Sequence, residues 1–154
     1  MNLVLDAGNT SVKAAVYQND TLQKKLIFPK EIFLQELEKI FKDYPQITHS
    51  ILSEVTKIDE QVIFELEKAT DFLRLRQDTH VPFQNEYHTP HTLGLDRIVL
   101  VAAAVDQFPK KNVLIIDAGT CITFDLKTAK EKYLGGAISP GLQMRFKSMH
   151  KFTA

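Results

Sequence analysis

The sequence predicts an α/β protein of two related lobes, the second of which is truncated. Over residues 1–108, three strand-like segments in a row are followed by alternating helix-like and strand-like segments. The strand–strand–strand–helix order then begins again and occupies residues 109–154. In both lobes the apolar run of the first strand ends in Asp-Ala-Gly. This repetition indicates an internal duplication, with a boundary near Phe108.

The first lobe begins with three strands connected by short turns, which favours an antiparallel meander. After Pro29 the apolar residues recur at helical spacing, and Pro45 ends that segment. A strand, an amphipathic helix and a short strand are then expected. The predicted strands are residues 2–7, 11–17, 21–28, 50–55 and 72–75, and the predicted helices are residues 32–41 and 58–69.

A further helix, predicted over residues 93–107, follows a polar loop and ends before Pro109. The second lobe then starts without a low-complexity linker, so we expect a direct helix-to-strand junction. Its predicted strands are residues 112–117, 120–126 and 132–138, and Pro140-Gly141 precede a last helix-like segment.

The composition is that of an ordinary globular domain, with 44% hydrophobic and 25% charged residues. Because 19 basic residues balance 19 acidic ones, no broad positive field attracts nucleic acid or an anionic membrane. The apolar helical runs are too short to span a bilayer. The chain opens without a cationic leader, and its single cysteine, Cys121, has no intrachain disulfide partner. We therefore expect a cytoplasmic location, with no nucleic-acid or membrane partner.

The repeated turn has the composition of a phosphate-binding element. Gly8 and Gly119 carry no side chain that would block a phosphate, and Thr10 and Thr120 add hydroxyl donors. Backbone N–H groups in such a turn can converge on one anion.

An aspartate stands at the end of the strand before each turn. Asp6 and Asp117 would repel a phosphate unless a cation lay between, so they predict a hydrated Mg²⁺ that bridges nucleotide oxygens. For either turn alone, an ordinary Asp-Gly hairpin is an equal alternative. Two copies opening two similar lobes favour phosphate binding.

Four segments occur in a characteristic order: DAGNTSVK at residues 6–13, TLGLDR at 92–97, DAGTCITFD at 117–125 and GGAISPG at 135–141. In order and spacing they resemble the type III pantothenate kinase family, within the actin, sugar-kinase and chaperone-ATPase superfamily. The resemblance covers essentially the whole chain. It implies an actin-like, ribonuclease H-like fold of duplicated β-β-β-α-β-α-β lobes, the second one truncated.

The resemblance implies ATP-dependent phosphorylation of the primary hydroxyl of pantothenate to 4'-phosphopantothenate, the first step of coenzyme A biosynthesis. The implied cofactors are ATP, Mg²⁺ and a monovalent cation, K⁺ or NH₄⁺. The implied assembly is a homodimer whose interface completes the pantothenate site.

The resemblance also implies roles for individual residues. Asp96 would accept the proton of the pantothenate hydroxyl, and Asp117 would bind the monovalent cation. The implied nucleotide-binding residues are Asp6, Ala7, Gly8, Asn9, Thr10, Ser11, Val12, Lys13 and Thr120. The implied pantothenate-binding residues are Tyr87, Gly94, Leu95, Asp96 and Arg97.

The positions of Asp96 and Arg97 are chemically consistent with these roles. Asp96 falls near the start of a predicted helix, where the dipole favours a carboxylate. A carboxylate is a weak base for an alcohol, but phosphoryl transfer needs the hydroxyl oriented more than deprotonated early. Arg97 could pair in a forked geometry with the substrate carboxylate or with developing phosphate charge. The alternative is an ordinary helix-start charge beside a solvated arginine.

Several features have plainer interpretations. GGAISPG fits either a backbone approach to a ligand or a tight turn without one. Cys121 is expected to be a small buried residue, and His88 and His91 to be solvated in a loop.

Two functional alternatives stay open. One is a catalytically inactive truncated homologue that acts as a binding or regulatory protein, such as a transcriptional accessory factor; the other is an acetate or sugar kinase, which should lack Tyr87 together with TLGLDR.

Overall fold

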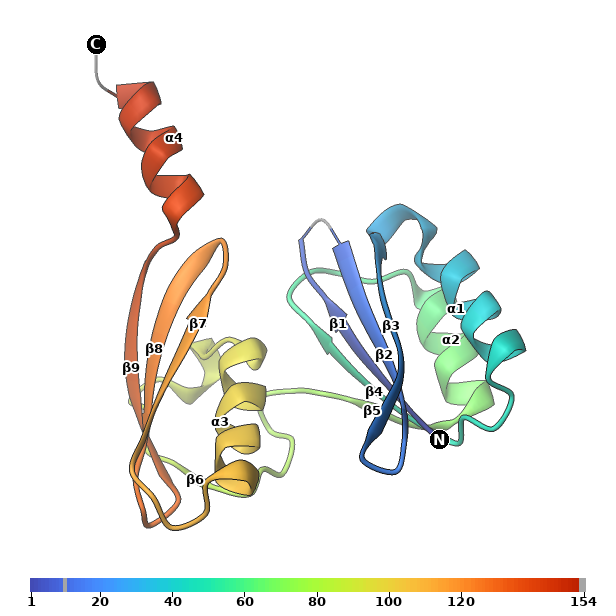
Figure 1. Ribbon diagram of the computed structural model, residues 1–154, viewed down its shortest axis with the longest axis horizontal. Coiled ribbons are helices and arrows are strands. Elements are labelled where there is room, and N and C mark those ends of the chain that lie inside the picture. Colours follow the sequence, from blue (N-terminus) through green and yellow to red (C-terminus); the bar gives the residue numbers. More distant parts are fainter. Residues whose placement is uncertain (10, 153–154) are drawn as a thin grey trace. The chain divides into compact units, whose positions relative to one another are not determined.

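The computed structural model describes residues 1–9 and 11–152. The chain divides into two compact units, Met1–Arg76 and the part from Gln77 onward. The first unit contains one five-stranded sheet and the second contains one four-stranded sheet. Each unit has its own sheet with helical cover (Figure 1).

The first sheet has the strand order β3-β2-β1-β4-β5. Strands β1, β2 and β3 pair antiparallel in sequence, which confirms the predicted meander. Strands β4 and β5 continue the sheet in parallel with β1. The strands are β1 (Asn2–Ala7), β2 (Ser11–Gln18), β3 (Thr21–Pro29), β4 (His49–Glu54) and β5 (Asp71–Arg74).

Two helices, α1 (Phe33–Asp43) and α2 (Glu60–Ala69), bury their apolar sides against one face of this sheet. The Asp59 side chain accepts a hydrogen bond from the N–H of Gln61 and so caps the start of α2. A 3₁₀ turn, η1 (Lys30–Ile32), leads into α1. The buried core comes from the inward positions of β1 and β2 and from both helices, and includes Leu3, Leu5, Val12, Val16, Leu37, Ile40, Val62 and Leu66.

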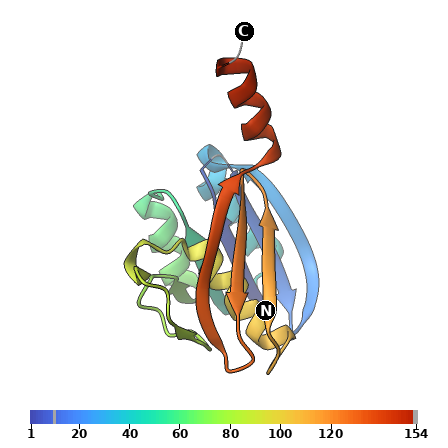
Figure 2. The ribbon, with the colours of Figure 1, turned by 90° about the vertical axis from the view of Figure 1, so that its left-hand side faces the viewer.

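The second sheet has the order β6-β9-β8-β7 (Figure 2). Strands β7, β8 and β9 again pair antiparallel in sequence, and the short β6 lies parallel to β9. The elements are β6 (Gln84–Asn85), η2 (Pro90–Thr92), α3 (Leu95–Gln107), β7 (Val113–Ala118), β8 (Cys121–Lys127), β9 (Lys132–Pro140) and α4 (Leu142–Phe152).

The division between the units differs from the boundary expected near Phe108. Helix α3 packs against β7 and β8 of the second sheet. Its buried side includes Ile98, Val101 and Ala104, which cover the inner face of that sheet. The helix predicted to close the first lobe is therefore part of the unit that follows.

The β-β-β-α-β-α-β order of the first unit and the β-β-β-α order of β7–α4 are as predicted. Strand β6 and the 3₁₀ turns η1 and η2 were not predicted from the sequence. Strand β6 is only two residues long and is held by backbone bonds, from Gln84 N–H to Glu131 O (2.8 Å) and from Glu86 N–H to Tyr133 O (2.9 Å). Within the described part of the chain, no helix is long and apolar enough to cross a membrane.

The face of β8 that meets α3 carries polar side chains. Thr123, Asp125 and Lys127 alternate along the strand, and all three are buried. Lys127 Nζ donates to the carbonyl of Phe108, just beyond α3, at 2.9 Å and pairs with Glu131 at 2.5 Å. This ammonium group satisfies a carbonyl at the end of α3, and it ties that end to the β8–β9 turn.

Gly136 allows β8 and β9 to pair closely, because a Cβ there would lie 1.7 Å from the carbonyl oxygen of Phe124. We expect Gly136→Ala to lower the free energy of unfolding by more than about 3 kcal/mol, since overpacking against backbone cannot relax as a side chain can. Urea denaturation followed by circular dichroism measures this change. Gly119→Ala is the matched control, because its Cβ would meet nothing closer than 3.9 Å; equal losses in both variants would contradict the explanation.

Candidate functional site

The first turn joins β1 to β2 and presents two opposite charges to solvent. Asp6 and Lys13 are register partners, and Lys13 Nζ donates to Asp6 Oδ2 at 3.3 Å. Their side chains are 45% and 60% exposed, so both are accessible to a ligand. The N–H of Gly8 donates to Ser11 O at 3.0 Å and closes the turn. Thr10 lies outside the described residues.

The nucleotide-binding residues expected in this turn differ in whether their side chains are accessible to a ligand. Asn9 is exposed and Ser11 is half-buried. The side chains of Ala7 and Val12 are buried in the core of the first unit. Any contact that these two residues make with a nucleotide must therefore come from their backbone.

The second turn joins β7 to β8 and is built on glycine. The N–H of Gly119 donates to Cys121 O at 2.9 Å, and the N–H of Gly141 donates to Thr120 O at 3.0 Å. A Cβ on Gly141 would lie 2.2 Å from Gly119 O, so the last residue of GGAISPG must be glycine to pack on this turn. Asp117 and Thr120 are exposed, and Cys121 is only half-buried, not buried as expected.

The two turns are variants of one design. The last paired residues are Ala7 with Val12 in the first hairpin and Ala118 with Ile122 in the second. Three residues of the sequence, 8–10, separate β1 from β2, and two residues, 119–120, separate β7 from β8, so the second connection is one residue shorter. Each turn follows an Asp-Ala-Gly segment at the end of a first strand, as the duplication predicts.

The start of α3 holds an exposed carboxylate, that of Asp96. Gly94 occupies the N-cap position, and Asp96 Oδ1 accepts a hydrogen bond from the N–H of Arg97 at 2.9 Å. A Cβ on Gly94 would lie 2.3 Å from that oxygen, so glycine is what lets the carboxylate fold back over the helix end. The positive end of the helix dipole stabilises a carboxylate at this place.

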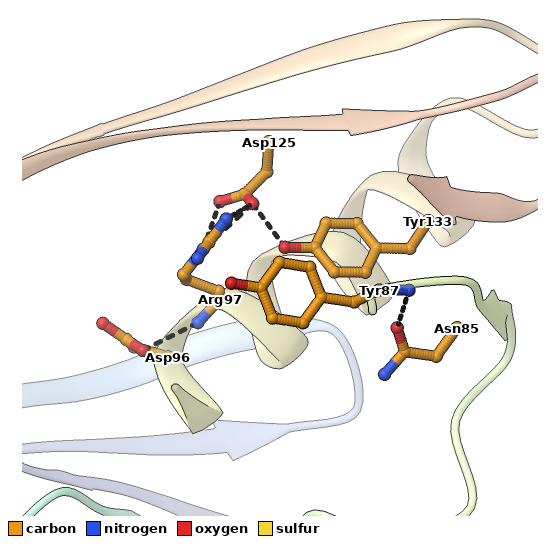
Figure 3. Close-up of polar contacts among 6 residues, drawn as sticks. All are labelled: Asn85, Tyr87, Asp96, Arg97, Asp125 and Tyr133. Carbon is orange, nitrogen blue, oxygen red and sulfur yellow. Dashed lines mark hydrogen bonds and ion pairs between the residues drawn. The ribbon is translucent and has the colours of Figure 1, made fainter. Parts of the chain in front are cut away.

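Arg97 is buried, with 9% of its surface exposed, so the interpretation of a solvated arginine is wrong. Its Nε lies 3.0 and 3.1 Å from the two carboxylate oxygens of Asp125, and its Nη2 lies 2.5 Å from Oδ1 (Figure 3). The forked pairing expected with a substrate is thus made with Asp125. This hydrogen bond raises the pKa of Arg97, so the guanidinium stays charged despite its burial.

Tyr87 lies over the same pair. Its ring centroid is 5.6 Å from Arg97 Cζ and 6.1 Å from the stacked ring of Tyr133. The Tyr133 hydroxyl donates to Asp125 Oδ1 at 2.6 Å. Gly135, at φ +92°, makes room for the Tyr87 ring, because a Cβ there would lie 2.8 Å from Tyr87 Cδ2.

The second unit therefore brings together three of the residues expected to bind pantothenate, those with a polar or charged side chain. They are Tyr87, Asp96 and Arg97. Leu95 is buried and contributes backbone only. Two members of the cluster were missed, Asp125 and Tyr133. The signal for Asp125 was in the sequence, since period-two alternation places it on the same face of its strand as Thr123 and Lys127.

The carboxylates of the two turns suit a hydrated cation better than a protein cage. Among residues 1–9 and 11–152, no three His, Cys, Asp or Glu side chains gather as a metal site. Asp6 and Asp117 each offer one accessible carboxylate. Mg²⁺ commonly keeps several waters and shares phosphate oxygens with one or two such groups, so these residues fit that ion.

We expect Tyr133 to make the stability of the second unit depend on pH. Burial, followed by the hydrogen bond to Asp125, raises the pKa of Tyr133 above its usual value of about 10. The stabilisation is then complete below about pH 10 and is lost as the pH rises beyond it, by at most about 1.4 kcal/mol per pH unit. Urea denaturation between pH 9 and pH 12 should give a shallower fall for Tyr133→Phe than for the parent chain. Equal slopes would exclude Tyr133 as the source.

Comparisons with solved structures support the fold. The chain aligns with a Ppx/GppA phosphatase from Aquifex aeolicus at a TM-score of 0.57 and 12% identity, over 98% of this chain and 55% of that one. A Sinorhizobium meliloti protein assigned as a 2-dehydro-3-deoxygalactonokinase gives the same TM-score and identity, over 99% and 58%. At this identity the likeness concerns the fold alone, and it confirms the actin-like, duplicated α/β class.

Sequence relatives are much closer. Proteins named type III pantothenate kinase from Christiangramia forsetii, Flavobacterium johnsoniae and Bacteroides fragilis are 60%, 41% and 42% identical to this chain. They match 99–100% of it, and the chain spans 63% of the length of each. The model of the type III pantothenate kinase family matches residues 2–154. The chain therefore belongs to the type III pantothenate kinase family, as its four motifs predicted.

Proposed function

We propose that this chain carries the catalytic base and substrate residues of a pantothenate kinase. The reaction transfers the γ-phosphoryl group of ATP to the primary hydroxyl of pantothenate, giving 4'-phosphopantothenate and ADP at the start of coenzyme A biosynthesis. One observation carries the proposal. In a member of this family, an exposed carboxylate at the start of α3, that of Asp96, adjoins the buried pair of Arg97 and Asp125 and the half-buried Tyr87.

Asp96 is the proposed proton acceptor. Its carboxylate is exposed, and the backbone N–H of Arg97 fixes one of its oxygens. The other oxygen is then free to accept the hydroxyl proton of pantothenate and to orient the attacking oxygen. A loose phosphoryl-transfer transition state requires this orientation more than early deprotonation. Tyr87, Gly94, Leu95 and Arg97 complete the proposed pantothenate site.

The proposed nucleotide-binding residues are those of the first turn, together with Thr120 of the second. In the first turn, the Lys13 ammonium and the backbone around Gly8 and Asn9 would bind phosphate oxygens. In the second, the exposed hydroxyl of Thr120 would do so. Residues 6–13, including Thr10, form the proposed nucleotide segment together with Thr120.

The proposed cations are Mg²⁺ with the nucleotide and K⁺ or NH₄⁺ at Asp117. When bound, Mg²⁺ supplies neutralisation of charge on the phosphate oxygens. Asp6 offers a carboxylate for its water shell, and Asp117 offers one at the second turn. These single, exposed carboxylates support weak binding that depends on the nucleotide.

The proposed assembly is a cytoplasmic homodimer. Helix α3 buries one side, yet Val99 is 40% exposed and Ala103 is also exposed on it. This apolar side is suited to a helix of a second copy. Nucleic acid and membranes are not proposed as partners, since the chain has no net charge.

A chimera tests the proposed reaction. In it, this chain replaces the matching 63% of the Christiangramia forsetii relative, so that a chain of full family length results. The chimera should consume ATP only when pantothenate, Mg²⁺ and K⁺ are present, as measured by coupled ADP release. Pantothenate-independent ATP consumption, or none at all from a folded chimera, would contradict the proposal.

Asp96→Asn in the chimera should lower kcat by about 100- to 10,000-fold, which is the usual contribution of a general base. The thermal midpoint should change little, because the side chain is exposed and nearly isosteric with asparagine. Asp106→Asn, at an exposed position of the same helix, is the control and should retain the parent rate. A parent-like rate in Asp96→Asn would remove Asp96 from the role of base.

Lys13→Met separates a phosphate contact from a structural ion pair. The pair with Asp6 is exposed, so its loss should change the free energy of unfolding by less than about 1 kcal/mol. Loss of a charged phosphate contact should weaken ATP binding by the chimera about tenfold, as measured by calorimetry. Lys24→Met, on exposed β3, is the control. Unchanged ATP affinity in Lys13→Met would exclude the contact.

A further inference from the structure

Asp125 is a fully buried carboxylate for which the proposed reaction has no direct use. It lies in the middle of β8 with 0% of its surface exposed. Its partners are the Arg97 guanidinium, at 2.5–3.1 Å, and the Tyr133 hydroxyl, at 2.6 Å. A buried carboxylate is stable only when it is paired and hydrogen-bonded in this way.

These partners connect Asp125 to both sides of the proposed pantothenate site. On one side, Arg97 supplies the backbone N–H that holds the Asp96 carboxylate. On the other, Tyr133 stacks on Tyr87, which also lies over the Arg97 guanidinium. Figure 3 shows Asp125 above this group, with Asp96 on the other side of Arg97. The Asp125 carboxylate therefore orients Arg97, which holds the proposed base Asp96. It also orients Tyr133, which stacks on the proposed substrate-binding residue Tyr87.

The pairing also limits what Arg97 can do. Asp125 occupies the Nε and Nη2 edge of the guanidinium, so a two-armed contact with a substrate carboxylate through that edge is excluded. Only the remaining part of the group can face a ligand. Asp125 thus sets which edge of Arg97 is presented.

We propose that Asp125, assisted by Tyr133, is a positioning residue for the pantothenate site, acting through Arg97 and Tyr87. This inference rests on the proposed function. It adds a residue on strand β8 that does not contact the reacting atoms but fixes the groups proposed to do so.

Lys127 provides a matched comparison within the same strand. It lies two residues further along β8, on the same face, and is also fully buried in an ion pair, with Glu131. Its second partner is the carbonyl of Phe108, just past the end of α3 and not at its start. Replacing Lys127 therefore breaks a comparable buried pair that is not connected to Asp96 or Tyr87.

The test compares Asp125→Asn with Lys127→Met in the full-length chimera. Asp125→Asn should lower kcat/KM for pantothenate by about 10- to 100-fold, as expected when a substrate-orienting charged contact is lost, with KM for ATP within about twofold of the parent. Lys127→Met should lower the thermal midpoint but leave kcat/KM for pantothenate within about threefold of the parent. Equal kinetic losses in the two variants would make Asp125 merely structural and would overturn the inference.

Tyr133→Phe keeps the test decisive if Asp125→Asn does not fold. It removes only the hydroxyl that donates to Asp125 and leaves the ring stacked on Tyr87. It should reproduce the selective loss for pantothenate at about 3- to 10-fold. If Asp125→Asn does not fold, a parent-like kcat/KM in Tyr133→Phe would overturn this inference. If both variants fold, a parent-like kcat/KM in both would overturn it. Either result would leave the proposed function standing. An inactive parent chimera would instead overturn the proposed function, and this inference with it.

Discussion

The interaction on which the candidate site of the second unit rests is the buried ion pair of Arg97 with Asp125. Two charges that leave water lose hydration, and only close geometry with further hydrogen bonds compensates for that loss. Here the guanidinium edge meets both carboxylate oxygens, and Tyr133 fills a further acceptor site. The pair joins the start of α3 to the centre of β8. Because Arg97 holds the Asp96 carboxylate and Tyr133 stacks on Tyr87, the same ion pair also fixes the positions of Asp96 and Tyr87.

Glycine sets the second constraint, because side chains or backbone approach the main chain closely at several places. Gly94, Gly135, Gly136 and Gly141 each leave space that a methyl group would fill, and each faces a different neighbour. Two of them serve the proposed pantothenate site, by admitting the Asp96 carboxylate and the Tyr87 ring. The others serve strand pairing and the second turn. The motif GGAISPG is therefore explained by packing within the unit, and no ligand contact is needed to account for its glycines.

Much of the fold could be predicted because its periodicities are local. Alternating strands and the helical spacing of α1, α2 and α3 are properties of short windows of sequence, and the duplicated Asp-Ala-Gly segments gave the turns. The boundary could not be found in this way. The periodicity of α3 says that it has an apolar side, but not which sheet that side covers. The two-residue β6 has no periodicity at all.

The candidate site, like the fold, could be predicted only in part from local sequence patterns. Tyr87, Asp96 and Arg97 were identified through a resemblance and do lie together. The partner of Arg97, however, is 28 residues away on strand β8, and no local pattern pairs the two residues. A charged residue at an inward strand position is the one local sign that a partner must exist. Asp125 and Lys127 both carried that sign, and each has such a partner.

Both ends of helix α3 are hydrogen-bonded to β8. Arg97, near the start of the helix, pairs with Asp125, and Lys127 donates to the carbonyl of Phe108, just past the end of the helix. Fraying of either helix end must therefore uncover a buried charge, which makes partial opening costly compared with concerted opening. We therefore expect the amide hydrogens of α3 and β8 to exchange with solvent as one cooperative group.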